Sequence, residues 1–180
     1  MRAATSLLLS ICVVALCAAA LDTSFDRVAA ALAAGATAEA VGDRNVLRDA
    51  ASLLASAGAV PADGQDDLSR RWGSARTTSP QPVPAYRDRA LGPAYRAISL
   101  PAGSAAVFQQ TFLAGQRARI AVIGVRRSDF LLSVTDDGDA KICETTSRAA
   151  CDWVPPWTTR FKLRVVNSGK LPGTYYLLIQ

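Results

Sequence analysis

The fold is read most clearly from TRFKLRVVN, residues 159–167. Apolar side chains alternate there with cationic ones: Phe161, Leu163 and Val165 in one set of positions, and Arg160, Lys162 and Arg164 in the other. Successive side chains of a β-strand point to opposite faces, so this alternation predicts a strand with one apolar and one cationic face. Such a strand fits a sheet that covers a core on one side and meets solvent on the other.

Seven further segments in the C-terminal half show the short apolar runs and the period of two that are typical of strands. Turn residues such as Asp137-Gly138-Asp139 and Pro172-Gly173 separate them. This spacing predicts a mainly β fold, an antiparallel jelly-roll-like β-sandwich preceded by a short α-helical N-terminal segment. The expected strands are residues 95–100, 105–113, 116–124, 130–135, 140–144, 151–154, 159–167 and 174–180.

The alanine-rich segment 21–60 is expected to contain two helices. Gly35 is expected to end the first helix; Asp43 is expected to cap the second, and Gly58 followed by Pro61 to end it. Narrow apolar stripes need a partner surface, so a hairpin packed on itself or on the main domain is expected, with a docking or dimerising segment as the alternative. The stripes are Phe25, Val28, Ala29 and Leu32, then Leu47, Ala50, Ala51 and Leu54.

Residues 61–94 are rich in Pro, Gly, Ser and mixed charge and show little periodicity. Three prolines, Pro80, Pro82 and Pro84, favour an extended linker. Trp72 is the one large aromatic group between the helical segment and the prolines, and it could fasten the linker to a neighbouring surface. The expected organisation is a signal peptide over 1–20, a helical segment over 21–60, a linker over 61–94 and a sandwich domain over 95–180.

The N-terminus has the layout of a secretory signal peptide, with Arg2 before an apolar run from Leu7 to Ala20. Cleavage is expected after Ala20, which predicts a secreted protein, in the bacterial periplasm, without a membrane span once the signal is removed. Lipidation at Cys17 and retention of the run as an anchor are the alternatives. Loss of Arg2 would lower the formal charge from +5 to +4, a mildly basic balance that does not demand nucleic acid.

Cys143 and Cys151 are the cysteines that remain after the predicted cleavage. An isolated pair in an oxidising compartment is most simply a disulfide, and this one would close a loop of about nine residues. A zinc site would need two further ligands, and the chain has no histidine to supply them.

The absence of histidine excludes several kinds of active site. Ser-His-Asp triads, Cys-His nucleophiles and histidine-ligated metals all need this side chain. The chain also lacks the glycine-rich phosphate-binding motifs. We therefore expect a protein that is not an enzyme and has no catalytic residues.

Four stretches together resemble the bacterial pre-peptidase C-terminal domain: FLAGQRARIAVIG, SDFLLSVTDDGD, CDWVPPWTTRFKLRVVNSG and YYLLIQ. The resemblance covers about residues 95–180. It implies a jelly-roll-like β-sandwich of a kind that accompanies secreted enzymes, often proteases, and is usually not itself catalytic. Some members of that family bind calcium through an acidic segment.

The acidic segment of this chain contains Asp129, Asp136, Asp137 and Asp139 as candidate calcium ligands. The resemblance places a second aspartate where this chain has Leu131. Asp and Gly also accept the backbone angles of tight turns, so ordinary turn chemistry is the alternative. No cofactor is expected, apart from this possible calcium site.

A second candidate site is cationic: Arg117, Arg119, Arg160, Lys162 and Arg164. If their two strands are neighbours in one sheet, these side chains form a patch that fits an anionic glycan or an acidic envelope or secreted protein. A solvated outer face is the alternative. Nucleic acid fits poorly because no aromatic side chains lie between the cations.

A third candidate is the tryptophan pair Trp153 and Trp157, which could contact a sugar or a partner. The intervening Pro155-Pro156 favours a bend that turns both rings inward. Taken together, the sequence predicts a secreted, non-catalytic binding or accessory module. A calcium-binding module of the same fold, and a folding helper or inhibitor associated with a secreted hydrolase, are the alternatives.

Overall fold

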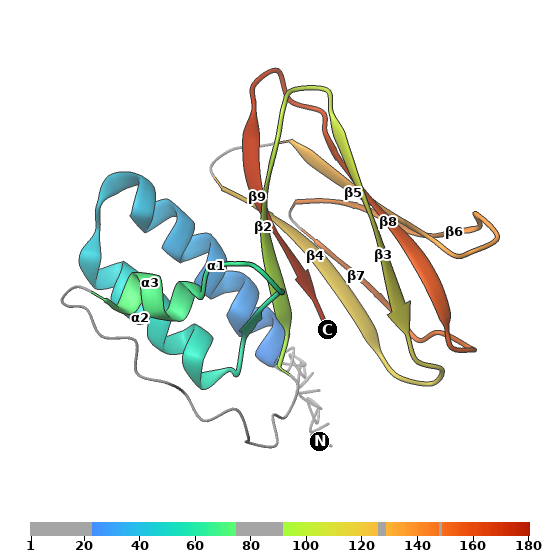
Figure 1. Cartoon of the computed structure of the whole chain (residues 1–180), viewed down its shortest axis with the longest axis horizontal. Helices are drawn as coiled ribbons and strands as arrows, with labels where there is room; N and C mark the ends of the chain where they lie inside the picture. Colours follow the sequence, from blue (N-terminus) through green and yellow to red (C-terminus); the bar gives the residue numbers. More distant parts are fainter. Residues whose placement is uncertain (1–22, 75–91, 126–128, 148) are drawn as a thin grey trace, which may run out of the picture.

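The computed structural model describes residues 23–74, 92–125, 129–147 and 149–180, which form three layers (Figure 1). The first layer holds three helices: α1 (Ser24–Val41), α2 (Arg44–Ser56) and α3 (Leu68–Gly73). The second, sheet A, has the strand order β1 (Val60–Pro61), β2 (Ala94–Leu100), β9 (Gly173–Ile179), β4 (Ala118–Gly124) and β7 (Ala150–Trp153). The third, sheet B, has the order β3 (Ala105–Phe112), β8 (Thr159–Asn167), β5 (Phe130–Thr135) and β6 (Lys141–Thr146).

The β-sandwich predicted from the sequence is confirmed. All eight strands expected after residue 94 are present, and they pair antiparallel within the two facing sheets. Strand β8 lies in the middle of sheet B, between β3 and β5. Its apolar residues are buried and its cationic residues are exposed, as the alternation predicted.

The core between the sheets is built from the inward faces of sheet B and sheet A. Leu132, Leu163 and Leu177 are almost completely buried in it, and the rings of Phe130 and Tyr175 lie 4.8 Å apart. Burial of such side chains is the main favourable contribution to folding, about 1.5–3 kcal/mol for each large aliphatic side chain. This core therefore contributes strongly to holding the two sheets together.

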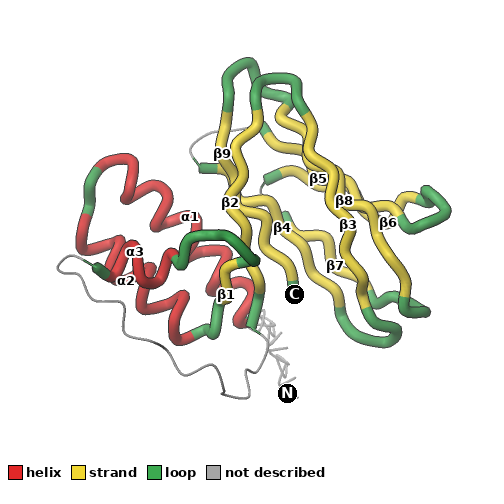
Figure 2. The backbone as a smooth tube through the Cα atoms, in the orientation of Figure 1, coloured by secondary structure: helices red, strands yellow, loops and turns green. Residues whose placement is uncertain are grey.

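The helical layer covers the other face of sheet A and creates a second core (Figure 2). Phe25, Leu32 and Leu54 from the helices pack with Tyr176 and Leu178 from β9. Strands β4 and β9 are consequently buried on both faces over most of their length. Helices α1 and α2 pack as a hairpin on the sandwich, as predicted, and α3 completes the layer.

Gly35 does not end the first helix, contrary to the sequence prediction. Helix α1 continues to Val41 and ends at Gly42, whose φ of 77° is the left-handed conformation that favours glycine. The reason is a contact with a distant residue: a Cβ built on Gly35 would lie 2.2 Å from a ring carbon of Trp72. Glycine is needed at this position so that the indole can approach the helix backbone.

The predicted linker over 61–94 is also wrong for its first part. Residues 60 and 61 pair with β2, and Asp67 caps α3 by accepting hydrogen bonds from the N–H groups of Ser69 and Arg70. Trp72 in α3 is buried in the second core, so it fastens this segment to α1 and sheet A. Residues 75–91, with the three prolines, and the predicted signal peptide lie outside the described residues. Within the described part of the chain, no helix is long and apolar enough to cross a membrane.

Tyr175 presents a test of the inner core, because its buried hydroxyl has no hydrogen-bond partner among the described residues. Removing an unsatisfied buried hydroxyl removes a desolvation cost, so Tyr175→Phe is expected to raise the free energy of unfolding by about 1 kcal/mol. Tyr95→Phe is the matched control, because the Tyr95 hydroxyl accepts a hydrogen bond of 2.8 Å from the Leu68 N–H. That variant is expected to lose about 1–3 kcal/mol in urea unfolding. Equal effects of the two substitutions would contradict this description of the core.

Candidate functional site

The outward face of sheet B is the sheet face that the described layers leave open (Figure 1). We call this surface the outer face. Strand register places Arg164 beside Val107 on one side and Ser133 on the other, and Lys162 likewise lies between Gln109 and Thr135. The outer face contains Val107, Gln109 and Thr111 from β3, Arg160, Lys162 and Arg164 from β8, and Leu131, Ser133 and Thr135 from β5.

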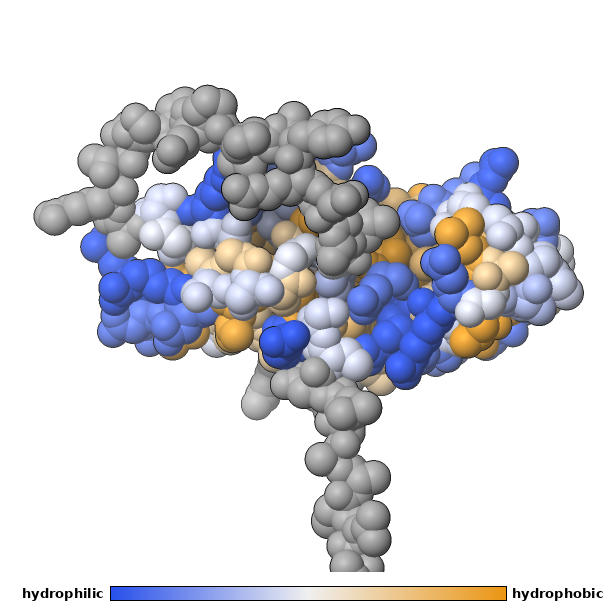
Figure 3. Space-filling view, turned by 90° about the horizontal axis from the view of Figure 1, so that it is seen from below, coloured by the Kyte–Doolittle hydropathy of each residue, from blue (hydrophilic) through white to orange (hydrophobic). Residues whose placement is uncertain are grey.

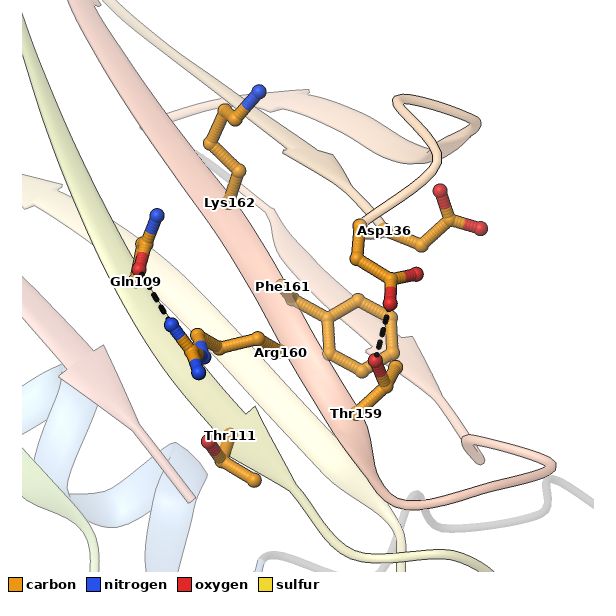
Figure 4. A pocket seen from close by; sticks show the side chains of 8 residues that line it. Gln109, Thr111, Asp136, Thr159, Arg160, Phe161 and Lys162 are labelled. Atoms are coloured by element: carbon orange, nitrogen blue, oxygen red, sulfur yellow. Dashed lines mark hydrogen bonds between the residues drawn. The ribbon is translucent and has the colours of Figure 1, made fainter.

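A groove of about 550 Å³ lies at one end of the outer face, where the β5–β6 turn rises beside β8 (Figure 4). Polar side chains from two strands and the turn line it; Phe161 also borders it, and the Phe161 ring packs into the core between the sheets. The lining residues are Gln109, Thr111, Asp136, Asp137, Thr159, Arg160, Phe161 and Lys162.

Hydrogen bonds and one ion pair hold the turn against β8. Asp137 Oδ2 accepts a hydrogen bond of 3.0 Å from the Thr159 hydroxyl, and Lys162 Nζ lies 2.6 Å from Asp139 Oδ1. Within the described residues, Arg160 has, by contrast, only a long contact of 3.5 Å to Gln109 Oε1. The groove therefore offers hydrogen-bonding groups and one guanidinium that is largely free to meet a ligand.

The candidate calcium ligands do not come together. Asp129 and Asp136 flank the two ends of the six-residue strand β5, which is about 20 Å long at about 3.3 Å per residue. Asp136 Oδ1 accepts a hydrogen bond from the Ala140 N–H within the turn, and Asp139 has a left-handed φ of 61°. No group of three or more acidic, cysteine or histidine side chains converges within the described part of the chain. The positions match turn chemistry.

The single cationic patch expected from the sequence does not form. Arg117 and Arg119 lie at the start of β4 in sheet A, whereas the cations of β8 lie on the outer face of sheet B. The prediction required the two strands to be neighbours, and the strand order places them in different sheets. Arg160, Lys162 and Arg164 share the outer face, whereas Arg117 and Arg119 both lie beside Asp152 in sheet A.

Arg119 instead joins the helical layer to sheet A. Its guanidinium lies 2.7 Å from Asp26 and stacks 4.3 Å from the centre of the Phe25 ring, and its side chain is only 12% exposed. The hydrogen bond from Arg119 lowers the pKa of Asp26 to about 2, and the bond from Arg117 lowers the pKa of Asp152. The lowered pKa values of Asp26 and Asp152 are those of carboxylates in structural ion pairs. A general acid needs a raised pKa, so neither carboxyl group fits that role.

The Asp26–Arg119 ion pair predicts a contribution to the free energy of unfolding that depends on pH. Asp26 has a pKa of about 2 in the folded protein and an ordinary value of 3.8, so it stabilises the fold above pH 3.8. The contribution disappears as the pH falls from about 4 to about 2. Because the side chain is nearly half exposed, solvent screening reduces the expected effect to about 1 kcal/mol. Asp26→Asn should lower the free energy of unfolding by that amount at pH 7 and by almost nothing at pH 2; an equal loss at both would contradict the ion pair.

The predicted disulfide between Cys143 and Cys151 is present. Cys143 belongs to β6 in sheet B and Cys151 to β7 in sheet A, so the bond links the two sheets at their edge strands. It lies on the side of the sandwich away from β2 and β3. The disulfide therefore fixes β6, the edge strand of sheet B.

The two tryptophans differ in their surroundings, and the expectation that both point inward is wrong for Trp157. The Trp153 ring packs 5.1 Å from the centre of Phe112 and 5.4 Å from that of Phe161. Trp157 is 61% exposed. Trp153 and the buried Pro155 already occupy this end of the core, so the bend sends the second ring outward.

Sequence reasoning missed a surface next to Trp157. The β3–β4 loop (113–117) and the β7–β8 loop (154–158) are held together, because the Gly115 N–H donates to the Pro155 carbonyl at 2.9 Å. Leu113 on one loop and Val154 on the other are 50% and 56% exposed. We call Leu113, Val154 and Trp157 the apolar tip. In the sequence, Leu113 and Val154 are the last residues of two expected strands, and Trp157 follows the second of them, so no motif marks this surface.

The comparisons with known proteins concern the fold. No family model and no curated protein matches the chain. Similar solved structures include two periplasmic inhibitors of g-type lysozyme: PliG of Aeromonas hydrophila (14% identity, 68% of this chain and 96% of that chain, TM-score 0.40) and PliG of Salmonella Typhimurium (12%, 53% and 93%, TM-score 0.39). A third is the pre-peptidase C-terminal domain of the Bacillus anthracis collagenase, at 14% identity over 47% of this chain and 87% of that chain, with a TM-score of 0.39. The family that the sequence resembles thus recurs among the solved structures similar to this fold.

Proposed function

We propose that the protein is an extracytoplasmic, non-catalytic module that binds a secreted or envelope protein through its outer face. One observation carries this proposal: the helical layer covers sheet A, while the outer face of sheet B is left open and carries two arginines without an ion-pair partner among the described residues. Arg164 has no ion-pair partner among the described residues, and Arg160 has only its long contact to Gln109. Arginine is enriched among the residues that dominate binding energy at interfaces.

The composition of the outer face supports a protein partner. The exposed Val107 lies beside Arg164, so an aliphatic contact and a guanidinium are available together at the middle of the sheet. Interfaces combine such apolar contacts with a rim of hydrogen-bonding groups. The groove supplies that rim, and its free Arg160 favours a partner with acidic side chains at the matching position.

The non-catalytic part of the proposal rests on the chemistry of the site. The chain has no histidine, and the Asp136 and Asp137 carboxylates of the groove accept hydrogen bonds that hold the turn and β8 in place. The extracytoplasmic part rests on the Cys143–Cys151 disulfide together with the predicted signal peptide.

The test is quantitative capture of a partner from the envelope fraction of the source organism. The face variant Val107→Ser/Arg164→Gln removes one aliphatic and one cationic group from neighbouring strands. Its matched control, Leu53→Ser/Arg48→Gln, removes the same two kinds of group from the exposed side of α2. We expect the face variant to retain less than about a tenth of the wild-type affinity, since losses of about 1.4 kcal/mol each give tenfold changes. Equal capture by both variants would contradict the proposal.

An anionic glycan is a second candidate, favoured by the polar lining of the groove. Titration with a sulfated or uronic-acid oligosaccharide, followed by the chemical shifts of Gln109 and Thr111, tests it directly. Saturable shifts that Arg160→Gln abolishes would support the glycan. Absence of shifts at millimolar ligand would exclude it.

A further inference from the structure

The apolar tip is exposed to an extent that the fold itself does not require. Leu113, Val154 and Trp157 are each at least half exposed, and they lie on two loops that contact each other. Single exposed apolar residues are common on protein surfaces, but a group of them on adjoining loops indicates an interaction site.

The tip is also rigid, which separates it from an ordinary mobile loop. The Ala114 N–H donates to the Thr158 hydroxyl oxygen at 3.0 Å, in addition to the bond between Gly115 and Pro155. Beneath it, Trp153 is fixed between two aromatic rings. The backbone of both loops is therefore held in place before any partner arrives, which lowers the entropy cost of binding.

The tip lies at the same end of the molecule as the start of α1 (Figure 1). Arg119, two residues after the β3–β4 loop, donates to the Thr23 hydroxyl at 2.5 Å, and its backbone N–H and carbonyl pair with Gln180 at the C-terminus. Figure 3 looks at this end from below and shows hydrophobic surface on the side of the sheets, next to a band of hydrophilic side chains.

The sequence that precedes this end is apolar. The run from Leu7 to Ala20 stops three residues before α1 begins at Ser24. Three fully extended residues span about 11 Å at most. For as long as this run is attached and lies in a bilayer, as the sequence predicts for a secretory signal or an anchor, the end of the molecule that carries the tip stays close to the lipid surface.

We propose that the apolar tip docks on the surface of an anionic lipid bilayer, with Trp157 at the level of the headgroups. Tryptophan is favoured there because its ring is apolar and its N–H is polar. The chain carries a formal net charge of +5, and a net positive charge favours anionic headgroups. This inference goes beyond the proposed function and uses a different surface, so the outer face stays available to a protein while the tip is on the membrane.

The test uses the protein recovered after export, with the N-terminus that the cell leaves, and vesicles of phosphatidylethanolamine and phosphatidylglycerol. Co-sedimentation of the wild type is compared with that of the tip variant Leu113→Ser/Val154→Ser/Trp157→Ser. We expect the partition coefficient of the tip variant to fall at least about tenfold. The matched control is Leu171→Ser, which removes a 77% exposed leucine from the β8–β9 loop at the opposite end of β8. It should bind vesicles as the wild type does.

A second measurement keeps the test decisive if the tip variant does not fold. Trp157→Phe preserves an aromatic ring, and Trp72 and Trp153 are packed in cores. Vesicles should therefore shift the tryptophan fluorescence of the wild type to shorter wavelength and leave that of Trp157→Phe unchanged. Absence of vesicle binding by the wild type, or equal binding by the tip variant, would overturn the inference. The face variant Val107→Ser/Arg164→Gln should still bind vesicles, which separates this result from that of the proposed function.

Discussion

Trp72→Ala is expected to destabilise the protein by about 4 kcal/mol, the largest effect we predict for a single substitution. The indole is almost completely buried between α1, α2 and sheet A, and it meets the Tyr176 ring edge-on at 6.3 Å. Loss of a buried aromatic side chain removes its transfer free energy and leaves a cavity, which together cost about 3–5 kcal/mol. Urea unfolding measures the effect directly. Trp157→Ala is the control; because that ring is exposed, the expected change is within about 0.5 kcal/mol.

A substitution at Gly35 tests the contact between this residue and the Trp72 ring. Gly35→Ala should be strongly destabilising in the wild type, because the new methyl group would lie 2.2 Å from the Trp72 ring. The same substitution in Trp72→Ala should cost little, since the ring is gone and alanine favours a helix over glycine. A double-mutant cycle therefore predicts strong coupling between the two positions. Additive effects would show that Gly35 and Trp72 are not in contact.

Removal of the disulfide is expected to lower stability as well. The chain-entropy relation gives about 2.6 kcal/mol for a loop of about nine residues, so Cys143→Ser/Cys151→Ser should lower the free energy of unfolding by about that amount. The bond links edge strands of different sheets, so amide exchange in β6 should increase more than exchange in β8.

Reductant provides the control for the disulfide. Adding it to the wild type should reproduce the loss, and adding it to the double serine variant should change nothing. The described role of the disulfide would be contradicted if the double serine variant kept its free energy of unfolding. It would also be contradicted if amide exchange increased uniformly in both sheets.

The sandwich could be predicted because its strands carry local signals. Strand β8 alternates cleanly, since one face lies against the core and the other against solvent. Strands β4 and β9, ARIAVIG and GTYYLLI, lack this alternation and are buried on both faces. Continuous apolar runs of this kind indicate a covered sheet, so the helical layer over sheet A had a sequence signal that alternation alone does not reveal.

The errors at Gly35 and in the linker have one physical cause. Glycine is a helix breaker by local preference, but here the close approach of Trp72 from α3 decides what fits at position 35. The same contact folds residues 68–73 onto α1, although their composition resembles a linker. Local preferences are weak, and tertiary packing overrides them.

The candidate site was only partly predictable for a related reason. Alternation identified Arg160, Lys162 and Arg164 as one face of a strand, and that face is exposed. Whether Arg117 and Arg119 join them depends on strand order, which is set by long-range pairing and not by spacing in the sequence. The groove and the apolar tip likewise arise where distant turns meet.

The most direct test of the account is photo-cross-linking in living cells from position 107 on the outer face. A photoreactive amino acid at Val107 is compared with the same amino acid at Leu53, which is similarly exposed on the helical layer. The account predicts one discrete adduct with an envelope or secreted protein from position 107, reduced by Arg164→Gln, and none from position 53. Adducts of the same partner from position 53, or no adduct from position 107, would contradict the claim that the outer face of sheet B is the binding surface.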